Sequence, residues 1–518
     1  MAIASLLVLF NIAAHFLPFE RRALGNDDYA LVGRSRSLSW SEVARLVPRQ
    51  PNRPLAFLVV MMQGKAIGDH ATRGLFLMLA VSSMVLLAVF ALLRLLLRNT
   101  DLAALGAVCF VVIPNKLEIY HLPIYTFGDV GTFVYLSSFI LMIRYAQRRQ
   151  GHLLFWSVAT YSVGILLYEP GFFLPVIFLV YLVRVHKMRP HAIGYFLIPA
   201  SLYAVFRITH AFGFADPLAM HPHVVNVALF PRNLLEWFHH YGGRYLVRSV
   251  LYGVTQYVLM EPVWLVVVSL TDVVIAVWLV RWLRRHPIAP VEDSLAVFGV
   301  VVFVVFSFPN LINGGIGGVG GMGGRQLVLP SVGLAMVVPW LFSKLKRSRV
   351  VAVCAIVTLL VICQGNAWTQ VVACRINDAV YTTMKEQREE LRLAERIIID
   401  TRSFADQIPF TWVPRDFNVL NTYYGAQTFE NWGLSSMVRL AVGDRGQTVF
   451  VATERPQPAG AGTLQFAVSE FRGYRTIEKR VHVVPRDGTA IIDYQRVFGG
   501  RFHHGLRQAS EQTSRVGT

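Results

Sequence analysis

The sequence predicts an α-helical protein that crosses a membrane many times and carries a soluble C-terminal domain of α/β or α+β structure. Apolar residues make up 54% of the chain and charged residues only 15%, and the mean hydropathy is +0.48. A typical soluble protein has about 25% charged residues. The apolar residues form long runs up to residue 367, and the composition becomes more polar from 368 onward.

About eleven segments are long and apolar enough to cross a bilayer, which takes about 20 helical residues. The predicted spans lie near 3–19, 72–97, 102–119, 129–147, 153–168, 170–184, 192–212, 256–281, 295–313, 326–343 and 350–367. The first span has no basic segment before it and no small-residue cleavage site, so we expect a retained anchor. Together these segments define a predicted transmembrane domain over 1–367.

The basic residues predict the orientation of this domain. Much of the net charge of +18 lies in short clusters after every second span. These clusters contain Arg94, Arg98, Arg144, Arg148, Arg149, Arg184, Lys187, Arg189, Arg281, Arg284, Arg285, Lys344, Lys346, Arg347 and Arg349. Such clusters stay on the cytoplasmic side, which predicts a cytoplasmic N-terminus and an extracytoplasmic C-terminal domain. Arg21 and Arg22 are the exception. Because the charge follows the spans, nucleic acid is not an expected partner.

Two adjacent carboxylates, Asp27 and Asp28, follow the first predicted span in an outer loop over 20–70. Transfer of a sugar from an activated donor needs a carboxylate that takes the proton of the acceptor hydroxyl. A second carboxylate can hold a divalent cation against the leaving phosphate. The alternative interpretation is the N-terminal cap of a helix.

Further carboxylates lie at the outer ends of later spans. Glu118 and Asp129 bracket a segment that contains His121, and they form a second candidate set. The alternative is that they cap helices beside aromatic residues at the membrane interface. Glu169 lies between two apolar spans, where a carboxylate needs a partner such as an arginine.

Two outer loops carry candidate basic residues. A glycine-rich run over 314–324 precedes Arg325. It lacks the GK[ST] ending of a nucleotide-binding loop, so it is a linker or, with Arg325, a loop that contacts phosphate. The loop over 213–255 contains Arg244 and several histidines without a clear third zinc ligand.

The predicted C-terminal domain covers 368–505. A charged helix is expected over 376–396. Apolar or alternating patterns predict strands at 397–400, 448–452, 464–468 and 480–484. The tail over 506–518 has the composition of a disordered terminus.

Four motifs occur in one order along the chain. They are Asp27-Asp28-Tyr29 with Arg53-Pro54-Leu55, then 113–118, 166–175 and 325–333. In this order they resemble the GT-C superfamily of integral-membrane glycosyltransferases, and most closely its protein O-mannosyltransferase-like branch. The resemblance covers roughly 20–335. The chain departs from the family pattern at Lys116, at Phe127-Gly128 and at Tyr168.

The resemblance implies a polyprenyl-phosphate sugar as donor and a hydroxyl of a glycan, lipid or protein as acceptor. It also implies catalysis at the extracytoplasmic face of the bacterial inner (plasma) membrane. The implied catalytic residues are Asp28, Asp27 and Glu118. The candidate donor-phosphate ligands are Arg325, Arg53 and Arg244, and the supporting residues are Glu169, His121 and Asp129. A divalent cation, Mg²⁺ or Mn²⁺, would be held by Asp28 and Glu118.

Two other hypotheses stay open. A transporter or flippase of lipid-linked glycans would bury charges in the middle of the membrane and contain broken helices in related halves. A catalytically inactive GT-C-like scaffold would keep the architecture without the chemistry.

Overall fold

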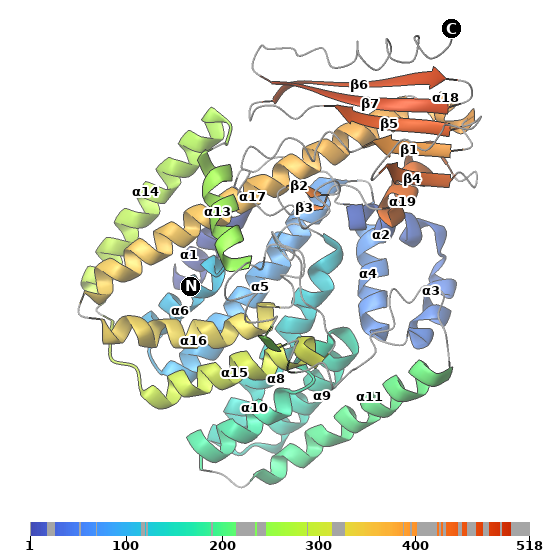
Figure 1. Cartoon of the computed structure of the whole chain (residues 1–518). Coiled ribbons are helices and arrows are strands. Elements are labelled where there is room, and N and C mark those ends of the chain that lie inside the picture. Colours follow the sequence, from blue (N-terminus) through green and yellow to red (C-terminus); the bar gives the residue numbers. More distant parts are fainter. Residues whose placement is uncertain are drawn as a thin grey trace.

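The computed structural model shows a helical bundle below a small β-sheet (Figure 1). It describes 2–17, 26–50, 53–68, 70–114, 116, 120, 123–187, 190–213, 231, 234–235, 245–258, 260–286, 288–312, 327–345, 347–386, 388–393, 396–400, 422–423, 426–427, 431–443, 448–452, 463–469, 476–486 and 489–498. The expected disordered tail over 506–518 lies outside these residues.

Helices dominate the part of the chain that the structure describes. They are α1 (Ala2–Asn11), α2 (Asn26–Ser37), α3 (Trp40–Leu46), α4 (Pro54–Ile67), α5 (Ala71–Leu97), α6 (Thr100–Val112), α8 (Thr126–Arg148), α9 (Gly151–Leu167), α10 (Leu174–Val180), α11 (Gly194–Gly213), α13 (Tyr245–Val258), α14 (Pro262–Arg285), α15 (Asp293–Ile312), α16 (Val328–Lys344), α17 (Ser348–Glu386), α18 (Arg388–Leu393) and α19 (Asn431–Val442). Short helical turns follow α1 at Ile12–Phe16 and precede α8 at Pro123–Tyr125.

Five described helical segments are long and apolar enough to cross a membrane, as expected of an α-helical membrane protein. They are Ala71–Leu97, Pro123–Arg148, Pro190–Thr209, Pro262–Arg285 and Ser348–Val371. Each coincides with a predicted span. Other predicted spans fall on shorter apolar helices, and the span near 170–184 divides into α10 and the π-helical turn Tyr181–Val185. A total of about eleven spans stays a prediction.

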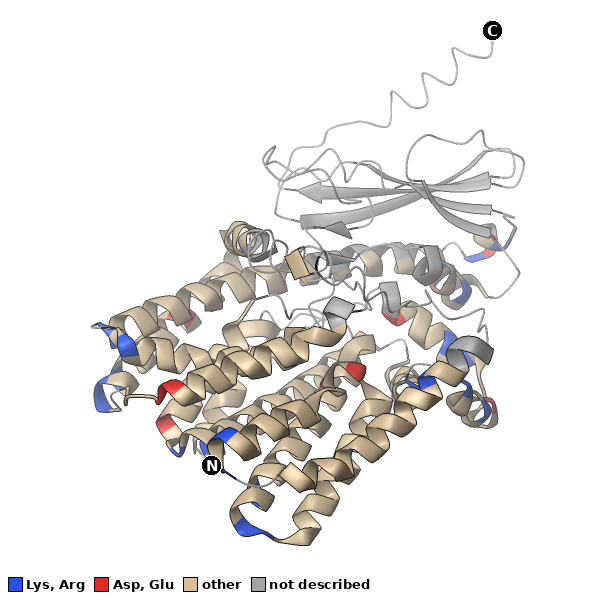
Figure 2. Ribbon diagram, turned by 60° about the horizontal axis from the view of Figure 1, so that its bottom comes forward, with Lys and Arg blue, Asp and Glu red and all other residues tan. Residues whose placement is uncertain are grey.

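The surface of these helices has the character of a lipid-facing surface. On α14, Val263 and Val274 are 73% and 67% exposed, and on α11 Leu202 is 67% exposed. Continuous apolar surface of this kind is rare on soluble monomers. Figure 2 shows that Lys and Arg gather at helix ends and connections, away from the helix interiors.

The centre of the bundle is formed by α5, α6 and α8. Every residue of α6 from Leu102 to Val112 is buried, as expected for a helix that is apolar on all sides. Glycines permit close helix pairs at the periphery. A Cβ at Gly333 would clash with the backbone of Gly299 between α15 and α16, and one at Gly365 would clash with Gly253 between α13 and α17. Small residues bring membrane helices together in this way.

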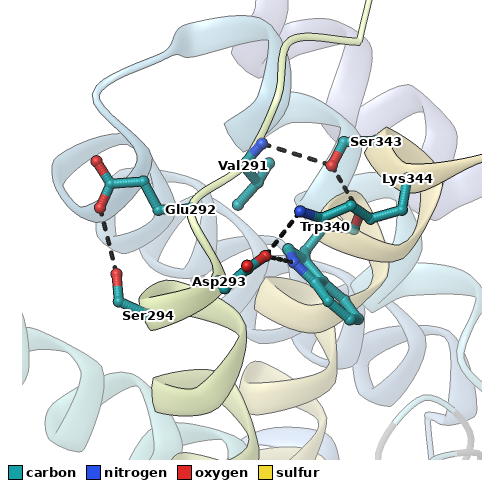
Figure 3. Close-up of polar contacts among 7 residues, drawn as sticks. All are labelled: Val291, Glu292, Asp293, Ser294, Trp340, Ser343 and Lys344. Carbon is teal, nitrogen blue, oxygen red and sulfur yellow. Dashed lines mark hydrogen bonds and ion pairs between the residues drawn. The ribbon is translucent and has the colours of Figure 1, made fainter.

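A polar cluster joins α15 and α16 at the end where basic residues gather (Figure 3). Asp293 Oδ1 accepts hydrogen bonds from Trp340 Nε1 at 2.7 Å and from Lys344 Nζ at 2.8 Å. Ser343 Oγ donates to the Trp340 carbonyl at 2.7 Å and accepts a longer bond from the Val291 amide. The cluster holds the first turn of α15 against the last turn of α16.

The C-terminal segment contains a five-stranded sheet with the order β4-β1-β5-β7-β6. Its strands are β1 (Arg396–Asp400), β4 (Thr448–Ala452), β5 (Thr463–Ser469), β6 (Thr476–Arg486) and β7 (Thr489–Phe498), and β2 (Thr422–Tyr423) pairs with β3 (Ala426–Gln427) outside it. β6 and β7 are antiparallel, and the other pairings in the sheet are parallel. The strands predicted at 397–400, 448–452, 464–468 and 480–484 coincide with β1, β4, β5 and β6.

The 39-residue helix α17 connects the apolar bundle to this segment without interruption. The predicted domain boundary at 367/368 lies inside α17. The charged helix expected over 376–396 is therefore the end of α17 followed by α18. The change in composition at 368 marks a change in what the helix contacts, and the helix itself continues.

Candidate functional site

The carboxylate of Asp28 is buried at the start of α2. Asp27 and Asp28 lie in the first helical turn, where the helix dipole favours negative charge. Asp28 is 1% exposed, and its Oδ1 accepts a hydrogen bond of 2.8 Å from the backbone amide of Ile124. A capping residue would bind amides of its own helix. The bond from Ile124 joins Asp28 to the turn that precedes α8, which is a long-range contact.

Arg53, Glu169 and Arg207 form a cluster of charges drawn from three separate parts of the chain. Arg53 Nε lies 2.5 Å from Glu169 Oε2, and Arg207 Nη1 lies 3.7 Å from Glu169 Oε1. Arg53 is therefore the arginine partner that the apolar surroundings of Glu169 predict. Two guanidinium groups share one carboxylate, so these three described side chains together carry one excess positive charge.

Aromatic rings hold the guanidinium group of Arg53 in place. Its Cζ lies 5.5 Å from the ring centroids of both Phe127 and Tyr168, within the range of cation–π attraction. The rings of Phe127 and Tyr168 also contact each other edge to face. Phe127 and Tyr168 are two of the positions at which the chain differs from the motifs of the GT-C superfamily. Both side chains pack against the guanidinium group of Arg53.

Two ionisable side chains, Asp129 and Lys116, are buried near this cluster in the sequence. Asp129 is 0% exposed and Lys116 is 1% exposed. Lys116 Nζ donates to the Phe110 carbonyl and lies 3.6 Å from the Phe110 ring centroid. Neither carboxylate oxygen of Asp129 has a hydrogen-bond partner among the described residues. Because an unsatisfied buried carboxylate is costly, this group is a candidate ligand-binding position.

The segment 123–129 connects these groups. Its Ile124 amide binds Asp28, its Phe127 ring contacts Arg53, and Asp129 lies two residues later. Gln63 Nε2 donates to Thr126 Oγ1, which joins α4 to the same segment. Of the predicted site residues, Asp129 belongs to this segment, Asp28 and Arg53 contact it, and Glu169 pairs with Arg53.

Several predicted site residues lie outside what the structure describes. They are Glu118, His121, Arg244, Arg325 and the side chain of Asp27. In the described part of the chain, no three His, Cys, Asp or Glu side chains are grouped closely enough to hold a metal ion. The proposed metal pair, Asp28 and Glu118, thus stays a prediction.

The sequence interpretation missed Arg207. It lies in an apolar stretch of α11, within the predicted span 192–212. An arginine in such a segment is costly and marks a partner or a function. That cost was the available signal, and Glu169 is the partner. The predicted outer loop over 20–70 likewise contains an unexpected apolar helix, α4, whose 14 residues are shorter than a full span.

The chain was compared with protein-family models and with curated proteins. The chain matches none of the protein-family models, and no curated protein shows significant similarity to it.

Proposed function

We propose that this chain is a membrane glycosyltransferase of GT-C type that moves a sugar from a polyprenyl-phosphate donor to an acceptor hydroxyl. One observation carries the proposal. Asp28, the expected base, is buried and hydrogen-bonded to the same segment that contacts Arg53, the expected phosphate ligand. Both residues belong to the first of the four ordered motifs, and both contact the segment 123–129, as residues of one active site are expected to do.

In the proposed mechanism Asp28 acts as the general base. The acceptor hydroxyl transfers its proton to the Asp28 carboxylate as its oxygen attacks C1 of the sugar. The bond between C1 and the phosphate oxygen breaks, and the polyprenyl phosphate leaves with the electron pair. Attack opposite the leaving group inverts the configuration at C1. The Ile124 amide holds one carboxylate oxygen, which fixes the direction of the other.

The positive charge in excess around Glu169 favours binding of the leaving phosphate. Charge that develops on the phosphate is stabilised by guanidinium groups that are already in place. Glu169 pairs with both Arg53 and Arg207, and the rings of Phe127 and Tyr168 also hold Arg53. Arg325 and Arg244 remain the other proposed phosphate ligands. A divalent cation held by Asp28 and Glu118 would supply further charge neutralisation, and no step above depends on it.

The proposed setting is a bacterial plasma membrane that the chain crosses about eleven times, with the sheet-containing segment outside the cell. The basic clusters at helix ends support this orientation. Reporter fusions after Lys344 and after the last strand, Thr489–Phe498, test it. The first reporter should be active only in the cytoplasm and the second only outside.

The donor and acceptor are tested by mass analysis. Surface glycans and glycoproteins of cells with and without the protein are compared, and the purified protein is then assayed with a panel of polyprenyl-phosphate sugars. A sugar that disappears from the cell surface and is transferred in vitro identifies both. Failure of the whole panel, with folded protein and a lost surface sugar, would favour the non-catalytic alternatives.

A second candidate function, transport of lipid-linked glycans, is favoured by one buried charge. Asp272 is 6% exposed in the middle of α14, and it accepts hydrogen bonds from Tyr257 at 2.7 Å and Gln364 at 2.8 Å. A carboxylate at this depth is the kind of group that transporters use. Movement of a labelled polyprenyl-linked glycan across vesicles without covalent transfer would support this candidate.

A further inference from the structure

One face of helix α2 packs against helix α19 of the C-terminal segment, which is far from α2 in the sequence. One contact joins Gly33 of α2 and Ser436 of α19. A Cβ placed on Gly33 would lie 3.3 Å from the Cβ of Ser436. This distance is shorter than an ordinary van der Waals contact. The two helices can therefore approach this closely because residue 33 is a glycine and has no Cβ.

A second contact lies one turn earlier on the same face of α2. The rings of Tyr29 and Tyr381 have centroids 5.0 Å apart and are tilted by 49°. Tyr381 belongs to the part of α17 beyond the apolar bundle, and both rings are buried. Tyr29 and Gly33 are four residues apart, which places them on one face of the helix. This face is therefore covered by α17 and α19 together.

Helix α19 is itself firmly packed, because residues next to Ser436 are buried. Met437, Val438 and Ala441 are buried at 0%, 2% and 5% exposure. α19 also packs against α17 and against β4 of the sheet. Because α19 is held by the sheet and by the end of α17, it can fix α2 in return.

We propose that α19 and the end of α17 position helix α2, and thereby Asp28, with Ser436 and Gly33 as positioning residues that set the distance between the helices. This inference rests on the proposed function, because it treats Asp28 as the base. It gives the C-terminal segment a role in the site: the segment holds one face of α2 while Ile124 holds the carboxylate.

The packing is tested with the full chain carrying Gly33→Cys and Ser436→Cys in a Cys354→Ser background, since Cys354 is the exposed cysteine. The Cβ separation of 3.3 Å is close to that of a disulfide, about 3.8 Å. We expect mild oxidation to link the two residues and mass analysis to identify the linked peptide. The single-cysteine variants serve as controls. The rate of disulfide formation in the double-cysteine variant is compared with the rate at which each single variant links to a natural cysteine. If the double variant is not faster, the proposal is overturned.

The positioning role is tested with Ser436→Leu and Ser436→Ala. Leucine should push α2 away and lower kcat about 10- to 100-fold, because small displacements of a reacting group cost this much. The donor KM should stay close to that of the parent protein, Ser436→Leu should still unfold cooperatively with a thermal midpoint above the assay temperature, and alanine should retain the parental kcat. An unchanged kcat in Ser436→Leu would overturn the proposal, as would a loss of kcat that alanine shares. If the cysteine pair links but Asp28→Asn keeps full transfer, the proposed function fails and the helix packing stands.

Discussion

The ion pair between Arg53 and Glu169 is expected to contribute measurably to the free energy of unfolding. Glu169→Gln removes the carboxylate charge and leaves two guanidinium groups facing each other across the glutamine. Two unit charges about 4 Å apart interact with about 4 kcal/mol at an effective dielectric constant near 20. The Arg53 side chain is 33% exposed and that of Glu169 is 18% exposed. Solvent screening therefore reduces the expected coupling to about 2 kcal/mol.

A double-mutant cycle measures this coupling directly. Arg53→Gln, Glu169→Gln and the double variant are unfolded in mixed detergent, and the coupling is the difference between the double and the summed single effects. The exposed pair of Arg392 and Glu389, 3.0 Å apart, is the matched control. We expect about 0.3 kcal/mol there, as for an ordinary surface pair on one helix. A coupling at Arg53 and Glu169 no larger than the control would show that partial burial does not strengthen this ion pair.

Three further predictions concern other parts of the chain. Ser39→Ala removes the side chain that caps α3 and should destabilise that helix by about 1 kcal/mol, measured as faster amide exchange confined to 40–46. Burial, followed by the charge of Arg98, lowers the pKa of His186. As the pH falls below about 6.5, His186 therefore binds a proton more readily in the unfolded chain than in the folded chain, and the free energy of unfolding falls. The thermal midpoint should consequently drop between pH 7.5 and 5.5, and less in His186→Gln; an equal drop in both would contradict this. Asp293→Ala should lower the thermal midpoint by loosening the contact with Lys344, whereas Glu292→Ala should not; equal effects would rule out the cluster of Figure 3 as the cause.

The sequence predicted those parts of the structure that depend on local pattern. Long apolar runs gave the five long helices, and alternating or apolar segments gave β1, β4, β5 and β6. Helix α4 was missed because its 14 residues are too short for the span criterion. Strand β7 was missed because its pairing with β6 depends on the register between two segments as well as on local pattern.

The candidate site was predictable as a set of residue types but less so as a set of contacts. The apolar surroundings of Glu169 predicted an arginine partner, because an unpaired charge there is costly. The bond between Asp28 and Ile124 spans 96 residues, and no local pattern encodes it. The same holds for Gly33 and Ser436, whose contact depends on how α19 packs against α17 and the sheet.

The proposed role of Asp28 as the base of a glycosyl-transfer reaction is tested most directly by one rate measurement. Purified Asp28→Asn is compared with the parent protein in transfer from the identified polyprenyl-phosphate sugar. Asp101→Asn serves as the control, since Asp101 pairs with His286 at the start of α6, away from the 123–129 segment. We predict that Asp28→Asn lowers kcat at least about 100-fold, in the range of general-base catalysis, while Asp101→Asn keeps the parental rate. Full transfer by folded Asp28→Asn would contradict the claim.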